Sequence, residues 1–129
     1  MRAVDTNVLV RLLTDDDVAQ TRIAKCAMAA GDVFITSTVL LETEWVLRGA
    51  YRYGRPELND ALRAVAGLPG VTFEAASEVA QALEWHENGM DFADAIHLAL
   101  ATRCDAFVTF DRKFAKRAKA LGALPVEVL

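Results

Sequence analysis

The 129-residue chain has few of the residues that cross-link small proteins or interrupt helices: two cysteines, three prolines and seven glycines. Cys26 and Cys104 lie far apart and form no Cys-x-x-Cys pattern. This excludes a disulfide framework or zinc ribbon and favours a reducing compartment. No apolar run approaches the roughly 20 residues that span a bilayer. Asp5 interrupts the only apolar stretch near the start, so we expect no signal peptide and a cytoplasmic location.

An excess of basic residues is missing as well. Eighteen acidic residues face 14 basic ones, giving a net charge of −4 and a pI near 5.1. This balance excludes a generic basic coat for nucleic acids, but it permits an enzyme that holds nucleic acid through metal ions and a local basic patch. Neither Gly-x-Ser-x-Gly nor a P-loop motif occurs, and the two histidines have no evident nucleophilic partner. A serine-hydrolase triad and a P-loop nucleotide site are therefore excluded.

The residues that are present indicate one compact domain covering 1–129. With 53% apolar and 25% charged residues, a chain of this size buries roughly two-thirds of its unfolded surface. We expect strands at 2–5, 33–36, 71–73, 106–110 and 125–128. We expect helices at about 7–14, 18–30, 38–53, 56–67, 77–88, 92–103 and 112–121, the third capped by Ser37 or Thr38. The alternation predicts an α/β fold with a mostly parallel central sheet flanked by helices.

Four acids fall where such a sheet places its functional edge. Asp5 ends the first strand, Glu42 lies about one turn into the third helix, Asp94 lies in the first turn of the sixth, and Asp111 ends the fourth strand. Strand ends and helix N-termini meet at the same edge of a parallel sheet, so we expect these carboxylates to converge. Clustered carboxylates raise one another's pKa values unless a cation lies among them. They are hard oxygen ligands suited to Mg²⁺ or Mn²⁺, which indicates a metal site for phosphoryl chemistry.

Helix capping is the alternative interpretation of several of these acids. Asp5 and Asp111 each precede an expected helix, and a carboxylate at a helix N-terminus is favoured by roughly 1 kcal/mol. Asp91 and Asp94 have the three-residue spacing of a capping box, and we assign Asp91 to the cap.

A helical wheel of the third expected helix places Glu42 and Glu44 on different faces. Glu42 falls beside Val39, Val46 and Gly49, on an apolar face. Glu44 faces elsewhere, four residues before Arg48. We therefore predict that Glu44 is a solvated surface acid paired with Arg48 and that Glu42 is functional, because a carboxylate on an apolar face is costly without compensation.

Four short motifs resemble the PIN domain, and their length and spacing resemble those of the VapC ribonuclease toxins. The motifs are Asp5-Thr6-Asn7-Val8-Leu9, Leu41-Glu42-Thr43-Glu44, Phe92-Ala93-Asp94-Ala95 and Val108-Thr109-Phe110-Asp111. They occur in the family's order with the expected elements between them and span nearly the whole chain. The resemblance implies a single PIN-like three-layer sandwich over residues 1–129.

The resemblance also implies an activity and partners. Family members of this kind are Mg²⁺- or Mn²⁺-dependent endoribonucleases in which metal-activated water cleaves RNA to a 3′-hydroxyl and a 5′-phosphate. Their acidic quartet of catalytic and metal-binding residues corresponds here to Asp5, Glu42, Asp94 and Asp111. Thr6 or Asn7, and Thr109, correspond to polar residues near the metal. The resemblance implies that the protein forms a homodimer and binds a small cognate antitoxin. It implies no association with a membrane.

A basic run in the last helix follows Asp111 directly. It comprises Arg112, Lys113, Lys116, Arg117 and Lys119. Such runs form solvated helix faces or, beside a metal site, bind the phosphates of a nucleic acid. We predict a mixture, with Arg112 and Lys113 nearest the substrate.

Three other functions compete with a ribonuclease. A phosphotransferase of the haloacid-dehalogenase kind wants an acid two residues after the first Asp, where this chain has Asn7. A receiver-like module needs adjacent acids after the first strand, and Asp5 is followed by Thr6. A catalytically silent PIN-like module that binds RNA or metal is the remaining alternative, and the intact quartet argues against it.

Overall fold

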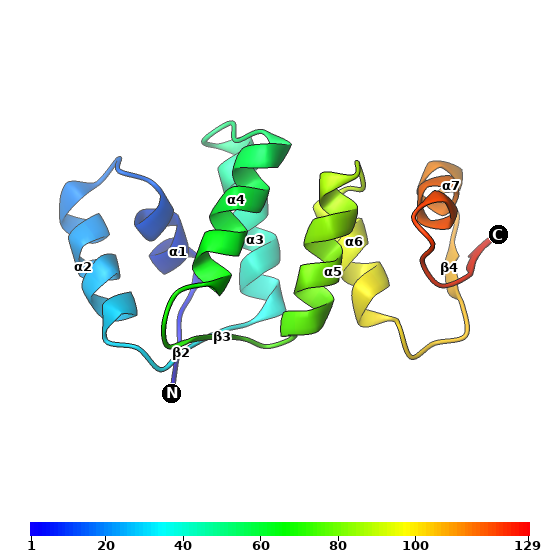
Figure 1. Cartoon of the computed structure of the whole chain (residues 1–129). Coiled ribbons are helices and arrows are strands. Elements are labelled where there is room, and N and C mark those ends of the chain that lie inside the picture. The colour runs from blue at the N-terminus through cyan, green and yellow to red at the C-terminus, as the bar shows by residue number, and fades with distance from the viewer. The chain divides into compact units, whose positions relative to one another are not determined.

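A computed structural model describes all 129 residues of the chain, which divide into two compact units, Met1–Ala76 and Ser77–Leu129 (Figure 1). The expected single domain over residues 1–129 stays a prediction. The longest helix has 13 residues, and no helix combines the length and apolarity required to cross a membrane.

The N-terminal unit consists of two β-α-α-β crossovers in succession. Its elements are β1 (Arg2–Ala3), α1 (Thr6–Leu13), α2 (Val18–Ala29), β2 (Val33–Ile35), α3 (Ser37–Gly49), α4 (Arg55–Ala66) and β3 (Val71–Phe73). The strands form a parallel sheet in the order β1-β2-β3, with a helix pair in each connection (Figure 1). Within the unit α1 packs on α2 and α3, and α4 packs on α3 and β3.

The central strand β2 sets the register of this sheet. Val33 pairs with Arg2 and Val71, and Ile35 pairs with Phe73. Val33 and Ile35 are fully buried, as expected for the middle strand of a parallel sheet. The carboxyl ends of the three strands therefore lie at one edge, where the chain turns into its helices.

Helix α3 ends earlier than the expected residue 53. Gly49 is its last residue, and Arg52 adopts a left-handed backbone with φ of +57°. The amide of Tyr53 donates to the carbonyl of Leu47 (3.0 Å), which closes the helix end. The Tyr53 hydroxyl donates to the carbonyl of Leu13, 3.1 Å away, so tertiary bonds of the turn replace a continued helix. At the other end of α3, the N-cap is Thr36 instead of the expected Ser37 or Thr38. The Thr36 hydroxyl accepts a hydrogen bond from the amide of Val39.

Gly70 is required by the turn into β3. Its φ is +75°, and a Cβ there would stand 2.8 Å from the Cα of Gly31. We expect Gly70→Ala to lower the free energy of unfolding by about 2–3 kcal/mol, because the left-handed conformation alone costs an L-residue roughly 1–2 kcal/mol and backbone must also shift. Gly67→Ala is the matched control, since its Cβ would meet ordinary contacts at 3.6 Å or more. Equal urea-unfolding curves for the two variants would contradict this prediction.

The C-terminal unit carries a second parallel pair of strands. Its elements are α5 (Ala76–Glu87, beginning at the boundary), α6 (Phe92–Leu100), β4 (Phe107–Thr109), α7 (Arg112–Ala120) and β5 (Val126–Val128). Phe107 pairs with Val126 and Thr109 with Val128. The rings of Phe107 and Phe114 lie 5.3 Å apart between centroids, which packs α7 onto β4. Asp111 thus occupies a tight turn between a strand and the helix packed on it.

The predicted α/β class with parallel strands is confirmed. The strands form two sheets, one in each unit. The sixth helix ends at Leu100 instead of residue 103, because the chain continues in two turns. In these turns the amide of Ala101 donates a hydrogen bond to the carbonyl of Leu98, and the amide of Cys104 donates one to the carbonyl of Ala101.

Candidate functional site

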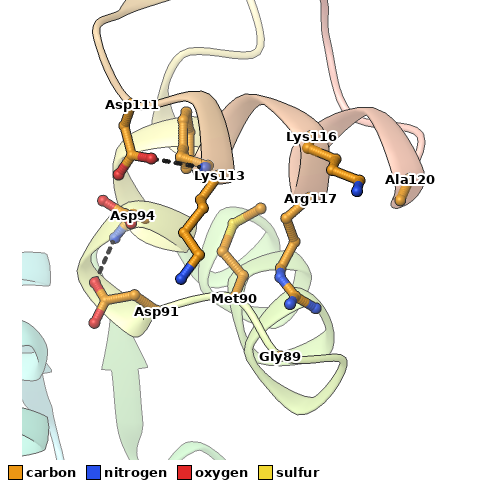
Figure 2. A pocket seen from close by; sticks show the side chains of 10 residues that line it. Gly89, Met90, Asp91, Asp94, Asp111, Lys113, Lys116, Arg117 and Ala120 are labelled. Carbon is orange, nitrogen blue, oxygen red and sulfur yellow. Dashed lines mark hydrogen bonds between the residues drawn. The ribbon is translucent and has the colours of Figure 1, made fainter.

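A pocket of about 560 Å³ in the C-terminal unit brings acidic and basic side chains together (Figure 2). Three acids that the sequence analysis singled out line the pocket, at the beginnings of α6 and α7. Asp94 and Asp111 were predicted to bind a metal, and Asp91 to cap a helix. Basic side chains of α7 line it as well. The full lining is Gly89, Met90, Asp91, Asp94, Asp111, Lys113, Phe114, Lys116, Arg117 and Ala120.

Asp111 is held by its own turn. Its Oδ1 accepts from the amide of Phe114 at 2.9 Å and caps α7, while its own amide donates to the hydroxyl of Thr109 at 3.0 Å. The alternative interpretation of Asp111 as a helix cap is therefore borne out, its metal-binding role stays a prediction, and Thr109 orients its backbone. The cap uses one carboxylate oxygen, so Oδ2 is left for another ligand.

Asp91 and Asp94 open α6. Asp91 is the N-cap, and its Oδ2 accepts from the amide of Asp94 at 3.1 Å (Figure 2). Burial raises the pKa of the Asp94 carboxyl above its ordinary value, and the negative charges of Asp91 and Asp111 raise it further. The nearby His97 acts in the opposite direction. Asp94 therefore carries a charge that its surroundings disfavour, as expected of a carboxylate in a site that attracts a cation.

The donor set of the pocket fits a hard divalent cation in part. Carboxylate oxygens suit Mg²⁺ and Mn²⁺, and Mg²⁺ is commonly held by one or two carboxylates while it keeps several waters. No group of three His, Cys, Asp or Glu side chains is close enough to form a ready-made metal cluster. Of the three acids that line the pocket, Asp94 and Asp111 are the two that the sequence motifs predict to hold a cation, and the charges of both Asp91 and Asp111 act on Asp94.

The basic residues of the pocket differ from those expected nearest to the substrate. Lys113 lines the pocket as predicted, whereas Arg112 does not. Lys116 and Arg117 take its place there. Helical spacing from Lys113 contains the signal that could have found them, because positions 113, 116 and 117 are three and four residues apart and share one side of α7.

In the N-terminal unit, Asp5 follows β1 and caps α1. It is exposed, and its Oδ1 accepts from the amide of Val8 at 3.3 Å. Thr6 is buried, while Asn7 is exposed and lines a separate hollow on the α1 and α2 surface. The alternative interpretation of Asp5 as a helix cap is borne out, and one of its carboxylate oxygens stays outside the cap, while its metal-binding role stays a prediction.

The helix-face interpretation of Glu42 and Glu44 is wrong in part. The buried face of α3 contains Leu40, Thr43, Glu44 and Leu47, so Glu44 is buried and Glu42 is exposed. The predicted pair of Glu44 with Arg48 is confirmed at 2.8 Å between Oε1 and Nε. The Glu44 side chain is only 4% exposed, however, and that of Arg48 is 51% exposed. Glu44 is thus a buried, paired acid, and the partner that compensates it lies one turn away.

Glu74 is an acid of the N-terminal unit that the sequence patterns did not single out. It directly follows β3, and its Oε1 accepts from the amide of Ser37 at 2.9 Å. This bond stabilises the first turn of α3, the helix that carries Glu42. Its position directly after a strand was the available signal.

Comparisons with known proteins identify a family. The model of the PIN domain family matches residues 2–120 of the chain. Among solved structures, the chain is similar to VapC20 of Mycobacterium tuberculosis, described as a toxin that cleaves the sarcin–ricin loop. That similarity has 24% sequence identity, covers 96% of this chain and 97% of the other, and has a TM-score of 0.43. No curated protein matches the chain significantly.

Proposed function

The chain belongs to the PIN domain family, and on this basis we propose that it is a divalent-metal-dependent endoribonuclease. The observation that carries the proposal is the pocket in which Asp94 and Asp111 lie beside basic side chains of α7. Acids that can hold a cation, next to cations that can hold phosphates, are what hydrolysis of an RNA phosphodiester requires. The motifs that resemble VapC toxins support a toxin that pairs with a cognate antitoxin and forms a homodimer.

Each acid of the quartet has a proposed role in one reaction. Asp5 and Glu42 act with Asp94 and Asp111 as metal-binding and catalytic residues. When bound, Mg²⁺ or Mn²⁺ would supply the Lewis acidity that activates water and offsets charge in an in-line transition state. Thr109 holds the turn of Asp111 through its hydroxyl.

The remaining predicted contacts serve the substrate in this proposal. Asn7 is exposed beside Asp5, and Lys113 is exposed in the pocket beside Asp94, so each is accessible to RNA. Thr6 is buried and adjoins Asp5 in the chain, which suits it to positioning. The pocket disfavours the negative charge on the Asp94 carboxylate, so binding of a cation there before the substrate would be favourable.

RNA cleavage by the purified protein tests this proposal. We expect discrete fragments from total cellular RNA in Mg²⁺ or Mn²⁺, no cleavage in chelator, and recovery when Mg²⁺ is restored, because carboxylates are hard ligands. Asp5→Asn should lack this activity while keeping its fold.

Two outcomes would contradict the proposal. Rescue by Zn²⁺ but not by Mg²⁺ or Mn²⁺ would argue against hard oxygen ligation. RNA binding without cleavage under any of these metals, by protein free of inhibitor, would favour the silent binding module.

A further inference from the structure

One side of α7 carries three cations into the pocket. Lys113, Lys116 and Arg117 all line it, followed by Ala120, and their spacing of three and four residues places them along a single stripe (Figure 2). We call Lys113, Lys116 and Arg117 the α7 stripe. It begins two residues after Asp111, the N-cap of the helix. Arg112 and Lys119 belong to the same helix but lie outside the pocket.

The cations of the α7 stripe are not neutralised by the neighbouring acids. Lys113 and Lys116 are exposed, and no ion pair joins either of them to Asp91, Asp94 or Asp111. Three positive charges thus stand beside three acids in an open pocket without closing onto them. Such an arrangement has room for an anion on the basic side.

Arg117 is the anchored member of the stripe. Its Nη1 donates to the carbonyl of Asn88 at 3.1 Å. Gly89 makes this approach possible, because a Cβ there would stand 2.5 Å from Nη1. One bond to a carbonyl leaves several guanidinium donors in a fixed orientation, which suits recognition of a phosphate.

We propose that the α7 stripe binds the RNA backbone, with Lys113 nearest to the scissile phosphate and Lys116 and Arg117 holding phosphates farther along the strand. The inference rests on the proposed function for the identity of the ligand. At 1.5 Å of rise per residue, the stripe extends about 6 Å along the helix from Lys113 to Arg117, so it follows a strand away from the acids. It also explains how a chain with a net charge of −4 grips a polyanion.

The test is binding of a fluorescein-labelled single-stranded RNA oligonucleotide, followed by fluorescence anisotropy in Ca²⁺ at several salt concentrations. Lys113→Ala/Lys116→Ala is compared with Arg103→Ala/Lys119→Ala, a control that removes the same charge from exposed positions of the C-terminal unit outside the pocket. We expect the stripe variant to bind roughly tenfold more weakly, with a salt slope flatter by about 1.4, since each lost single-strand contact removes about 0.7.

The results separate the stripe from the proposed nuclease. If the stripe variant alone loses affinity, the inference stands even if no RNA is cleaved, in which case the proposed activity fails by itself. If both double variants weaken RNA binding equally, the loss reflects the change in net charge and not the position of the lysines, and the inference is overturned. Absence of RNA binding by the wild-type protein overturns it too. In cleavage assays, the stripe variant should raise KM with little change in kcat, because it loses binding made equally in ground and transition states.

Discussion

Asp94→Asn is expected to reduce RNA cleavage by about 10²- to 10³-fold, the loss typical when one source of transition-state charge stabilisation is weakened, because Asp94 would hold the cation that supplies it. Asparagine keeps the size of the side chain and one oxygen, but it removes the negative charge that attracts the cation. The measurement is single-turnover cleavage of a defined RNA in Mg²⁺. Asp105→Asn, an exposed acid of the same unit outside the pocket, is the matched control. Wild-type rates for Asp94→Asn would remove Asp94 from the catalytic set.

The same substitution is expected to stabilise the metal-free protein at neutral pH. Burial and the charges of Asp91 and Asp111 raise the pKa of Asp94 above 3.8, so the folded state prefers the protonated acid. The favourable contribution of Asp94 is fully present below its unfolded pKa and is lost as the pH rises through its raised folded value. Above that window the wild type holds a disfavoured charge, which the Asp94→Asn variant lacks.

Thermal unfolding in chelator from about pH 4 to about pH 8 checks this sign. The Tm of Asp94→Asn should exceed that of the wild type increasingly as the pH rises, and then by a constant amount. Mg²⁺ should narrow the difference, because a cation that binds only the folded state stabilises the protein that retains the charge. A lower Tm for Asp94→Asn across the whole range would mean that the carboxylate is stabilising where it lies.

The order of elements was predictable because the local signals agree. Strong helix caps, glycines and short apolar segments occur in one consistent sequence, and Asp5, Asp91 and Asp111 each cap the helix that their spacing indicates. The stripe on α7 was also accessible, because it follows from helical spacing alone. Arg112 was expected nearer to the substrate because it adjoins Asp111 in sequence, yet adjacent helical residues point about 100° apart.

The buried face of α3 was less accessible, because tertiary packing decides which side of a helix is covered. The wheel placed Glu42 correctly beside Val39 and Val46, but those valines are only half-buried. The buried face includes Thr43 and Glu44, and these polar residues make that face look solvent-exposed in the sequence pattern. Thr43 is satisfied by donating its hydroxyl to the carbonyl of Val39 at 2.7 Å, and Glu44 by its pair with Arg48. Polar residues that find partners within their own helix can therefore occupy a face that composition predicts to be exposed.

Glu42→Gln and Glu44→Gln should consequently fail in different ways. Glu44→Gln keeps an acceptor for Arg48 but loses the charge of a buried pair, so we expect the free energy of unfolding to fall by about 1 kcal/mol, less than for a fully buried pair because Arg48 is half exposed. Glu44→Ala removes the carboxylate that pairs with Arg48 and should cost about 2 kcal/mol. Glu42 is exposed, so Glu42→Gln should leave stability unchanged and lower the rate of RNA cleavage.

Urea unfolding and single-turnover RNA cleavage, measured on both glutamine variants, separate a positioning acid from a catalytic one. The expected pattern is a stable but slow Glu42→Gln and a less stable Glu44→Gln whose cleavage rate, measured well below its unfolding midpoint, matches the wild type. A slow and fully stable Glu44→Gln together with an active Glu42→Gln would reverse the assignment. Glu44 would then act at the substrate, and its pair with Arg48 would have to open for RNA to bind, because a carboxylate that is 4% exposed cannot meet a phosphodiester or its cation where it lies.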